Sequence, residues 1–201
     1  MTAINLANLD VIVVADKSGS MGMERDTPTG VTRWAYAEEA ILGLVTQVGK
    51  FDDNGIEVIF FNNQFKVEEG VKPESFPSIW KGHNPGGGTT MAPPLKAALD
   101  LALGRRAEKQ QFIIVLTDGQ PSDGPAVEAT IIAATKAMDR DEQVAILFVQ
   151  VGRDAGAKAF LTNLDDGLEK GGAKFDIVDS DDIDTVANRP LQELVDKAFN
   201  D

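Results

Sequence analysis

The chain contains no cysteine and a single histidine among its 201 residues. Without thiols, a disulfide framework, a thiolate zinc or iron–sulfur site and a cysteine nucleophile are all excluded. The one imidazole, on His83, also excludes a zinc site built from several histidines. Any metal that this chain binds must therefore be held by oxygen atoms.

Basic residues are scarce as well, since 19 lysines and arginines stand against 32 aspartates and glutamates, for a net charge of -13. Nucleic-acid complexes need basic surface to displace counterions, so we expect no nucleic-acid partner. No apolar run approaches the length that crosses a bilayer, and the first ten residues have neither a basic region nor an apolar signal core. We therefore expect a cytoplasmic protein that has no membrane partner.

What the sequence does contain is a regular alternation of apolar runs and longer amphipathic segments, from which we expect a single domain, residues 1–201. Such alternation is typical of α/β folds with a parallel or mostly parallel sheet covered on both faces. Strands are predicted at 9–16, 56–62, 111–118, 144–152 and 173–180, with a short edge strand within 63–70. Helices are predicted at 34–51, 91–106, 125–140, 157–170 and 189–200.

Four segments have weaker patterns. A turn is expected at 52–55, and a loop with one helical turn at 71–88, which is rich in proline and glycine. The acidic stretch 176–184 is interpreted as a strand-to-helix loop, because it lacks the glycine and terminal glutamate of an EF-hand calcium loop. The charged segment 23–33 is expected to form a loop beside the predicted site.

Oxygen-bearing side chains follow two of the buried strands. Asp16, Ser18 and Ser20 stand at the exit of the first strand, and Asp118 stands at the end of the strand predicted at 111–118. Ligands of open parallel sheets bind beyond the carboxyl ends of the strands, so these groups should converge there. A glycine-rich loop at 84–90 should bring a threonine, Thr89 or the next residue, to the same place. Small oxygen donors of this kind suit a hard divalent cation.

The segments "DKSGS", "GGGTT" and "TDG" together resemble the metal-ion-dependent adhesion site of von Willebrand factor A domains, in the family's order and spacing. The resemblance implies a Rossmann-like three-layer α/β/α fold, with a mostly parallel central sheet and one short antiparallel edge strand. It also implies the metal ligands. Ser18, Ser20 and Thr89 bind directly, while Asp16 and Asp118 bind directly or through water. Thr89 is favoured because it lies six residues before Leu95, the usual family spacing.

The resemblance further implies a non-enzymatic protein-interaction module. The metal is expected to be a divalent cation, with Mg²⁺ favoured and Mn²⁺ or Ca²⁺ as alternatives. A glutamate or aspartate of a protein partner would complete its coordination sphere, and no small-molecule substrate is expected. The segments at 51–62 and 148–166 are similar to bacterial intracellular members from tellurite-resistance and stress-response operons. That narrower resemblance implies calcium-binding proteins of the same operons or AAA-type ATPases as partners.

Two alternatives remain open. A metal-dependent phosphohydrolase on a Rossmann-like sheet would need an activated nucleophile or general base and extra carboxylates. An aspartyl-phosphate enzyme would carry a second carboxylate two residues after Asp16, where this chain has Ser18. An inert scaffold, in which the metal only stabilises the strand ends, is the other alternative.

Overall fold

The structure is a computed structural model that describes residues 3–27, 30–51, 54–106 and 108–200. The predicted turn at 52–55 and loop at 23–33 lie partly outside these residues, at positions 52, 53, 28 and 29. The described elements are η1 (Leu6–Asn8), β1 (Leu9–Asp16), η2 (Gly19–Gly22), α1 (Arg33–Val48), β2 (Ile56–Phe61), β3 (Phe65–Val71), α2 (Phe76–Lys81), α3 (Ala92–Arg105), β4 (Gln110–Thr117), α4 (Gly124–Ala137), η3 (Asp141–Gln143), β5 (Val144–Gln150), α5 (Ala155–Gly167), β6 (Val178–Asp182), α6 (Ile183–Asn188) and α7 (Leu191–Ala198).

The strands form a six-stranded sheet in the order β3-β2-β1-β4-β5-β6. Neighbouring strands are parallel except for β2 and β3, which are antiparallel. Val14 of β1 pairs with Ile59 of β2 on one side and with Val115 of β4 on the other. The predicted mostly parallel sheet with one antiparallel edge strand is therefore confirmed.

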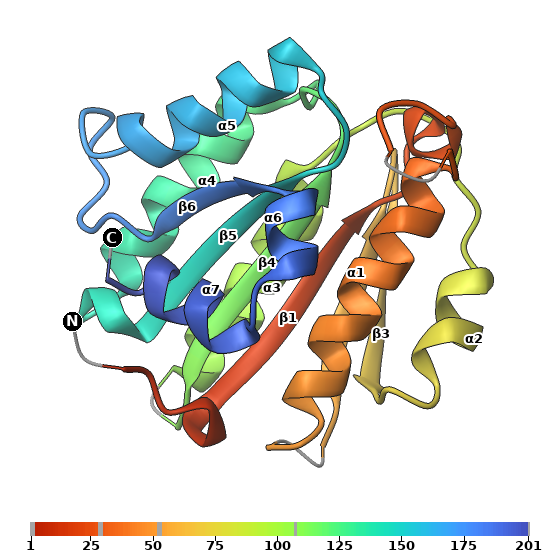
Figure 1. The fold of residues 1–201 in the computed structure, drawn as a ribbon. Coiled ribbons are helices and arrows are strands. Elements are labelled where there is room, and N and C mark those ends of the chain that lie inside the picture. The colour runs from red at the N-terminus through yellow and green to blue at the C-terminus, as the bar shows by residue number, and fades with distance from the viewer. Residues whose placement is uncertain (1–2, 28–29, 52–53, 107, 201) are drawn as a thin grey trace.

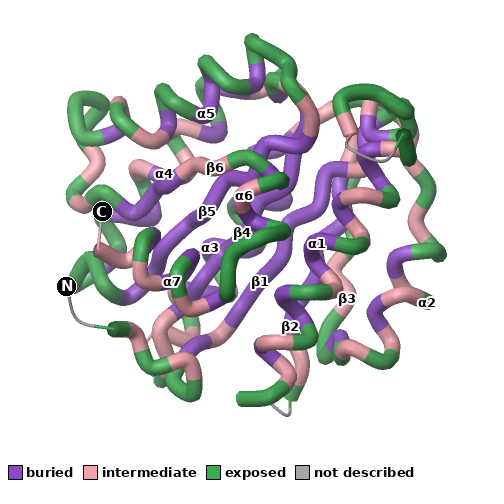
Figure 2. Tube along the Cα trace, in the orientation of Figure 1, coloured by how far each residue is buried: buried purple, intermediate pink, exposed green. Residues whose placement is uncertain are grey.

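Helices cover both faces of this sheet (Figure 1). Alternate residues of β1 divide between two hydrophobic cores: Val11 and Val13 pack with α1, α2, α6 and α7, whereas Ile12 and Val14 pack with α3, α4 and α5. Because both faces are covered, the central strands are apolar along most of their length, and Figure 2 shows them as buried segments. The three-layer α/β/α arrangement is thus confirmed.

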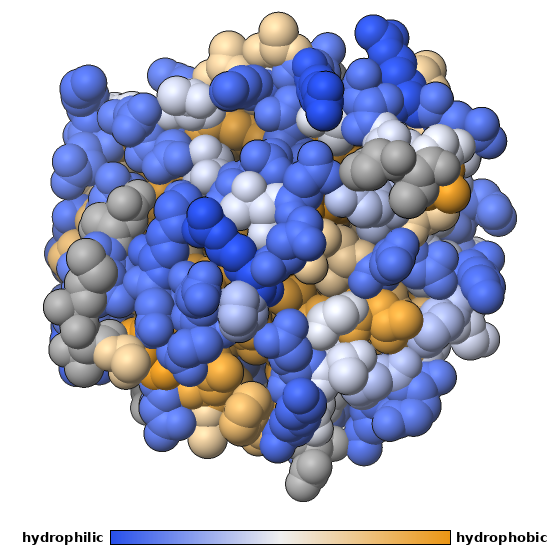
Figure 3. All heavy atoms as spheres, viewed as in Figure 1, coloured by the Kyte–Doolittle hydropathy of each residue, from blue (hydrophilic) through white to orange (hydrophobic). Residues whose placement is uncertain are grey.

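The helices bury one side and leave the other in water. In α1, the Thr32 hydroxyl caps the helix by accepting a hydrogen bond from the amide of Ala35 at 3.1 Å. Ile41, Leu44 and Val48 recur at helical spacing and are buried. The outer face formed by α1, α6 and α7 is largely hydrophilic (Figure 3). Among the described residues, no helix combines the length and the apolar character needed to cross a bilayer.

The last strand lies later in the chain than predicted. β6 and α6 together occupy most of the acidic stretch 176–184, which is therefore not a loop. β6 is an edge strand whose Asp179 is only 2% exposed. A tertiary ion pair explains this, because Nζ of Lys197 on α7 lies 2.7 Å from Oδ1 of Asp179. β6 pairs with β5 from Val178 to Asp182, so the strand begins at Val178 and not at residue 173.

The segment 71–88 contains a six-residue helix, α2, where one helical turn was predicted. Phe76 and Trp80 anchor it, since both side chains are fully buried. The Trp80 ring stacks on Trp34 of α1 with ring centroids 4.1 Å apart. This helix therefore closes the outer edge of the core that lies under α1.

Candidate functional site

The candidate site lies at the carboxyl edge of the sheet, between β1 and β4. The strand order reverses here, since β2 and β3 extend from β1 on one side and β5 and β6 from β4 on the other. Open α/β sheets bind ligands at such a switch point, because the diverging loops leave a crevice. The loop after β1 and the loop before α3 both reach this edge, at the upper right of Figure 1. Asp16 is the last residue of β1, and Asp118 follows β4 directly.

Ser18, Ser20 and Asp118 lie in direct contact at this edge. The two serine hydroxyls are 3.2 Å apart, and the Ser20 hydroxyl donates a hydrogen bond to Oδ1 of Asp118 at 2.7 Å. The short 3₁₀ turn η2 follows Ser18 directly and turns the chain across the edge of the sheet. The structure thus brings together three of the predicted ligands from two distant parts of the chain.

Asp16 is completely buried beside them. Its Oδ1 accepts a hydrogen bond from the amide of Ser18 at 2.7 Å, and its Oδ2 accepts one from the Thr117 hydroxyl at 2.8 Å. Burial raises the pKa of Asp16 to about 6, because desolvation outweighs the opposing effect of these hydrogen bonds. A nearby cation would favour the ionised form of this carboxylate.

The glycine-rich loop before α3 is attached to the first of these segments. The amide of Gly86 donates to the carbonyl of Lys17 at 2.8 Å, and the amide of Gly19 donates to the carbonyl of Gly87 at 3.0 Å. From the end of β2, Nδ2 of Asn62 donates to the carbonyl of Gly86 at 2.7 Å. These bonds fix the loop against the residues that carry the two serines.

Glycine is required at position 87 of this loop. Gly87 has a φ of +81°, and a Cβ atom there would lie 2.9 Å from Oδ1 of Asn63. Any other residue would therefore be strained and would collide with the asparagine. The same asparagine oxygen accepts a hydrogen bond from the amide of Gly88.

Thr89 is half-buried in this loop, and its carbonyl accepts hydrogen bonds from the amide and the hydroxyl of Ser122, at 2.9 and 3.0 Å. Asp123 holds the start of α3, because its two carboxylate oxygens accept the amides of Met91 and Ala92, each at 2.9 Å. Within the described chain, the Thr89 side chain makes no hydrogen bond to the other four predicted ligands. The structure therefore places Thr89 in the adjoining loop without joining it to their cluster.

The chemistry of the cluster fits a hard divalent cation. Asp16 and Asp118 provide two buried carboxylates, and Ser18 and Ser20 provide two hydroxyls, so every donor is a small oxygen group. In the parts of the chain that the structure describes, no group of three or more histidine, cysteine, aspartate or glutamate side chains forms a metal site. The mixed carboxylate and hydroxyl set is therefore the candidate metal centre.

Sequence reasoning missed Arg33, the first residue of α1. Its Nη1 donates to Oδ2 of Asp118 at 2.7 Å, and its Nη2 donates to Oδ2 of Asp26 at 3.0 Å. The Arg33 side chain is only 7% exposed. The signal in the sequence is a cation in the first turn of a helix, where the helix dipole favours anions.

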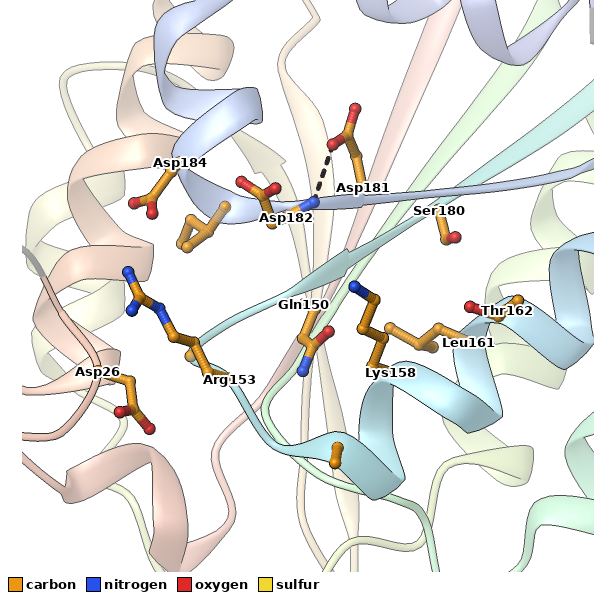
Figure 4. Close-up of a pocket in the computed structure, with 13 residues that line it drawn as sticks. Asp26, Gln150, Arg153, Lys158, Leu161, Thr162, Ser180, Asp181, Asp182 and Asp184 are labelled. Carbon is orange, nitrogen blue, oxygen red and sulfur yellow. Dashed lines mark hydrogen bonds between the residues drawn. The ribbon is translucent and has the colours of Figure 1, made fainter.

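Two adjoining cavities open beside the cluster. One, of about 450 Å³, is lined by Ser20 and Asp118 among others. The other, of about 610 Å³, lies between α5 and the β6–α6 segment (Figure 4). In Figure 4, aspartates of β6 and α6 line one wall, and Arg153 and Lys158 line the opposite wall. Asp26 and Arg153 line both cavities, so the hollow next to the cluster continues along the edge of the sheet.

The fold and this edge define the class of protein: a three-layer α/β/α domain with an oxygen-rich cluster at the switch point of its sheet. The family model of the von Willebrand factor type A domain matches residues 11–120, more than half of the chain. The chain therefore belongs to the von Willebrand factor type A domain family. The match spans all five predicted ligands: Asp16, Ser18, Ser20, Thr89 and Asp118. No curated protein sequence matches the chain.

Several solved structures share the fold. A von Willebrand factor type A protein from Catenulispora acidiphila is 16% identical with a TM-score of 0.65, covering 96% of this chain and 42% of that one. Manganese-loaded TRAP from Plasmodium vivax is 13% identical with a TM-score of 0.64, covering 98% of this chain and 75% of TRAP. Proximal thread matrix protein 1 from the mussel byssus, whose MIDAS motif holds zinc, is 19% identical with a TM-score of 0.57. The match covers 92% of this chain and 46% of the mussel protein.

The pilus adhesin SpaC from Lactobacillus rhamnosus GG is also similar, at 15% identity and a TM-score of 0.62 over 96% of this chain. The chain spans 30% of SpaC, so it corresponds to one part of a much longer protein. At these identities the likeness concerns the fold. The neighbours thus include an adhesin and two metal-bearing proteins on the fold of this chain.

Proposed function

We propose that the chain is a metal-dependent protein-interaction module. The observation that carries the proposal is the contact of Ser18, Ser20 and Asp118 at the switch point, next to the buried Asp16. A Mg²⁺ ion bound there would offer a Lewis-acidic position to a carboxylate. Thr89 and the two serines would hold the ion directly, and the two aspartates would do so directly or through water.

The charges of the cluster support an acidic partner. The serine hydroxyls are neutral, and one oxygen of Asp118 is already occupied by Arg33. The protein's own side chains therefore neutralise a dication incompletely, and a glutamate or aspartate of a partner would complete the charge balance. The cavity of about 450 Å³ beside Ser20 and Asp118 gives a partner side chain room to approach.

The neighbours support a divalent cation on this fold, because TRAP is manganese-loaded and the MIDAS motif of the mussel protein holds zinc. We propose Mg²⁺ for this chain, since its donors are all hard oxygen atoms. Binding rather than catalysis is the proposed role. Ser18 stands where an aspartyl-phosphate enzyme needs a carboxylate, and the similarity to a pilus adhesin agrees with this role.

The narrower assignment, to a tellurite-resistance or stress-response system, stays a prediction. It depends on the resemblance of residues 51–62 and 148–166. A partner from such a system would have to present an acidic side chain to the cavity that Ser20 lines.

Metal binding is the first test. Isothermal titration of the metal-free chain with MgCl₂ and MnCl₂ should show one site in the wild type and none in the double variant Ser18→Ala and Ser20→Ala. Ser78→Ala is the matched control, because Ser78 is exposed on α2, away from the cluster. Equal binding by the wild type and the double variant would refute the proposed ligands.

Partner binding is the second test. The immobilised chain is incubated with a native lysate in Mg²⁺ or in EDTA, and the retained proteins are compared between wild type and Ser18→Ala. Proteins retained only with Mg²⁺ and only by the wild type, and released by millimolar free glutamate, support the proposal. Retention that is the same in EDTA would exclude a metal-dependent contact and leave the scaffold alternative.

A further inference from the structure

One arginine joins the loop beside the site to a candidate metal ligand. Besides Asp118 and Asp26, the Arg33 guanidinium contacts the carbonyl of Arg25, to which its Nε donates at 3.2 Å. The side chains of Arg33 and Asp118 are 7% and 0% exposed. This ion pair is therefore buried, where charges interact far more strongly than at the surface.

The surrounding backbone is built to accommodate this guanidinium. Gly152, just after β5, has a φ of +86°, and a Cβ atom there would lie 2.6 Å from Nε of Arg33. On the other side lies Asp26, with a φ of +58°. Among the described residues, it is the single non-glycine residue with a positive φ. That conformation is rarely adopted, and the ion pair with Arg33 supports it.

We propose that Arg33 is a positioning residue that competes with the metal ion for Asp118. The proposal depends on the metal site proposed above. The guanidinium holds Oδ2 of Asp118, which leaves Oδ1 and the Ser20 hydroxyl bound to it for the cluster. Its positive charge also repels a dication, so Arg33 lowers the affinity of the site for metal.

Two consequences follow from this competition. A metal ion that shares Asp118 with an arginine is less completely neutralised, so it binds a partner's carboxylate more strongly. Coupling is reciprocal, so metal binding must in turn weaken the contact of Arg33 with Asp118. Because Arg33 also holds Arg25 and Asp26, the described part of the loop, residues 23–27, responds to the metal.

The test measures Mn²⁺ affinity of the full chain by titration, with no partner present. Arg33→Gln removes the charge and should tighten Mn²⁺ binding by about fivefold or more, within the roughly 5- to 150-fold range typical of coupled sites. Arg153→Gln is the matched control, because Arg153 lines the same cavity but is exposed. Its change should stay within about twofold, since salt screens exposed charges.

The outcomes separate the two proposals. If the wild type binds no Mn²⁺, the proposed function fails. If the wild type binds Mn²⁺ and Arg33→Gln binds it equally or more weakly, the competition is overturned. An equal gain in Arg33→Gln and Arg153→Gln would also overturn it, because the effect would then be one of net charge.

A second measurement does not depend on whether the Arg33→Gln variant folds. The Nε–H resonance of Arg33, assigned by its loss in Arg33→Lys, is followed in the wild type as Mg²⁺ is added. We expect it to shift or broaden, because weakening the Nη1 contact with Asp118 moves the whole guanidinium and disturbs the Nε bond to the carbonyl of Arg25, while the resonance of Arg153 stays in place. A signal of Arg33 that does not change at saturating Mg²⁺ would refute the competition.

Discussion

Replacing Asp16 by asparagine should make the metal-free protein more stable. Asp16 is completely buried, and burial raises its pKa from 3.8 to about 6. Asp16 is therefore still mainly ionised at neutral pH, and the buried charge destabilises the fold relative to the unfolded chain. Asparagine keeps the shape and both hydrogen bonds, because its oxygen can accept the amide of Ser18 and its amide can donate to the Thr117 hydroxyl.

The size of the effect follows from the shift in pKa. Because the folded-state pKa of Asp16 is raised, the fold binds its proton more tightly than the unfolded chain does. The destabilisation is absent well below pH 3.8, grows as the pH rises from 3.8 to about 6, and levels off above that. The difference of roughly two units corresponds to about 3 kcal/mol at pH 8 and falls to roughly 0.5 kcal/mol at pH 4.

The assay is thermal unfolding in EDTA at pH 8 and at pH 4. For a domain of this size, about 3 kcal/mol raises Tm by roughly 6 to 12 °C, so Asp16→Asn should exceed the wild type by that amount at pH 8 and by little at pH 4. Asp100→Asn serves as control, since Asp100 is an exposed partner of Lys96 on α3 and should change Tm little at either pH.

Adding Mg²⁺ to the same experiment should remove the difference in stability between the two proteins. At about 100 times its Kd, Mg²⁺ should stabilise the wild type by about 2.7 kcal/mol and leave Asp16→Asn unchanged, so the two proteins become similar in stability. The reasoning is refuted if Asp16→Asn is no more stable than the wild type at pH 8 in EDTA, or if its advantage is the same at pH 4.

Three further substitutions test the supports of the site by urea unfolding. Gly152→Ala should cost about 2 kcal/mol or more, because its φ is positive and the new methyl group would meet Nε of Arg33; a neutral result would contradict the described packing. Thr117→Val should lower the free energy of unfolding by about 1 to 3 kcal/mol in EDTA at pH 8, because it removes the hydroxyl that donates to Asp16. A loss of stability that is no smaller at pH 4 would argue against that reason. Asp123→Ala should cost about 1 to 2 kcal/mol, because its carboxylate holds the first amides of α3, and unchanged stability would show that water replaces it.

The order of the central strands and helices was predictable because the sheet is buried on both faces. The run from Val11 to Ala15 has no polar residue, and each of its side chains packs into one of the two cores. The misplaced strand β6 buries an acidic residue, Asp179, next to Val178, and the charge of Asp179 is met by Lys197 of α7. A local pattern contains no information about a partner that a later helix supplies.

Four of the candidate ligands could be selected from the sequence because they stand within a few residues of the end of an apolar run: Asp16, Ser18, Ser20 and Asp118. Arg33 could not be selected in the same way. Its partner Asp118 lies 85 positions further along the chain, and the two meet only in the fold, where the start of α1 lies beside the end of β4. Local patterns show which groups stand at a strand end, and the tertiary fold decides which charges those groups meet.

Because Gly152 packs closely against Arg33, substitutions at these two positions should be coupled in evolution. A residue with a side chain can replace Gly152 only after Arg33 has been replaced. Conversely, an arginine can arise at position 33 only while position 152 is glycine. Homologous sequences that carry a side chain at position 152 should therefore lack the arginine at position 33. In relatives that lack the arginine, the aspartate after β4 would face the proposed metal ion without a competing guanidinium.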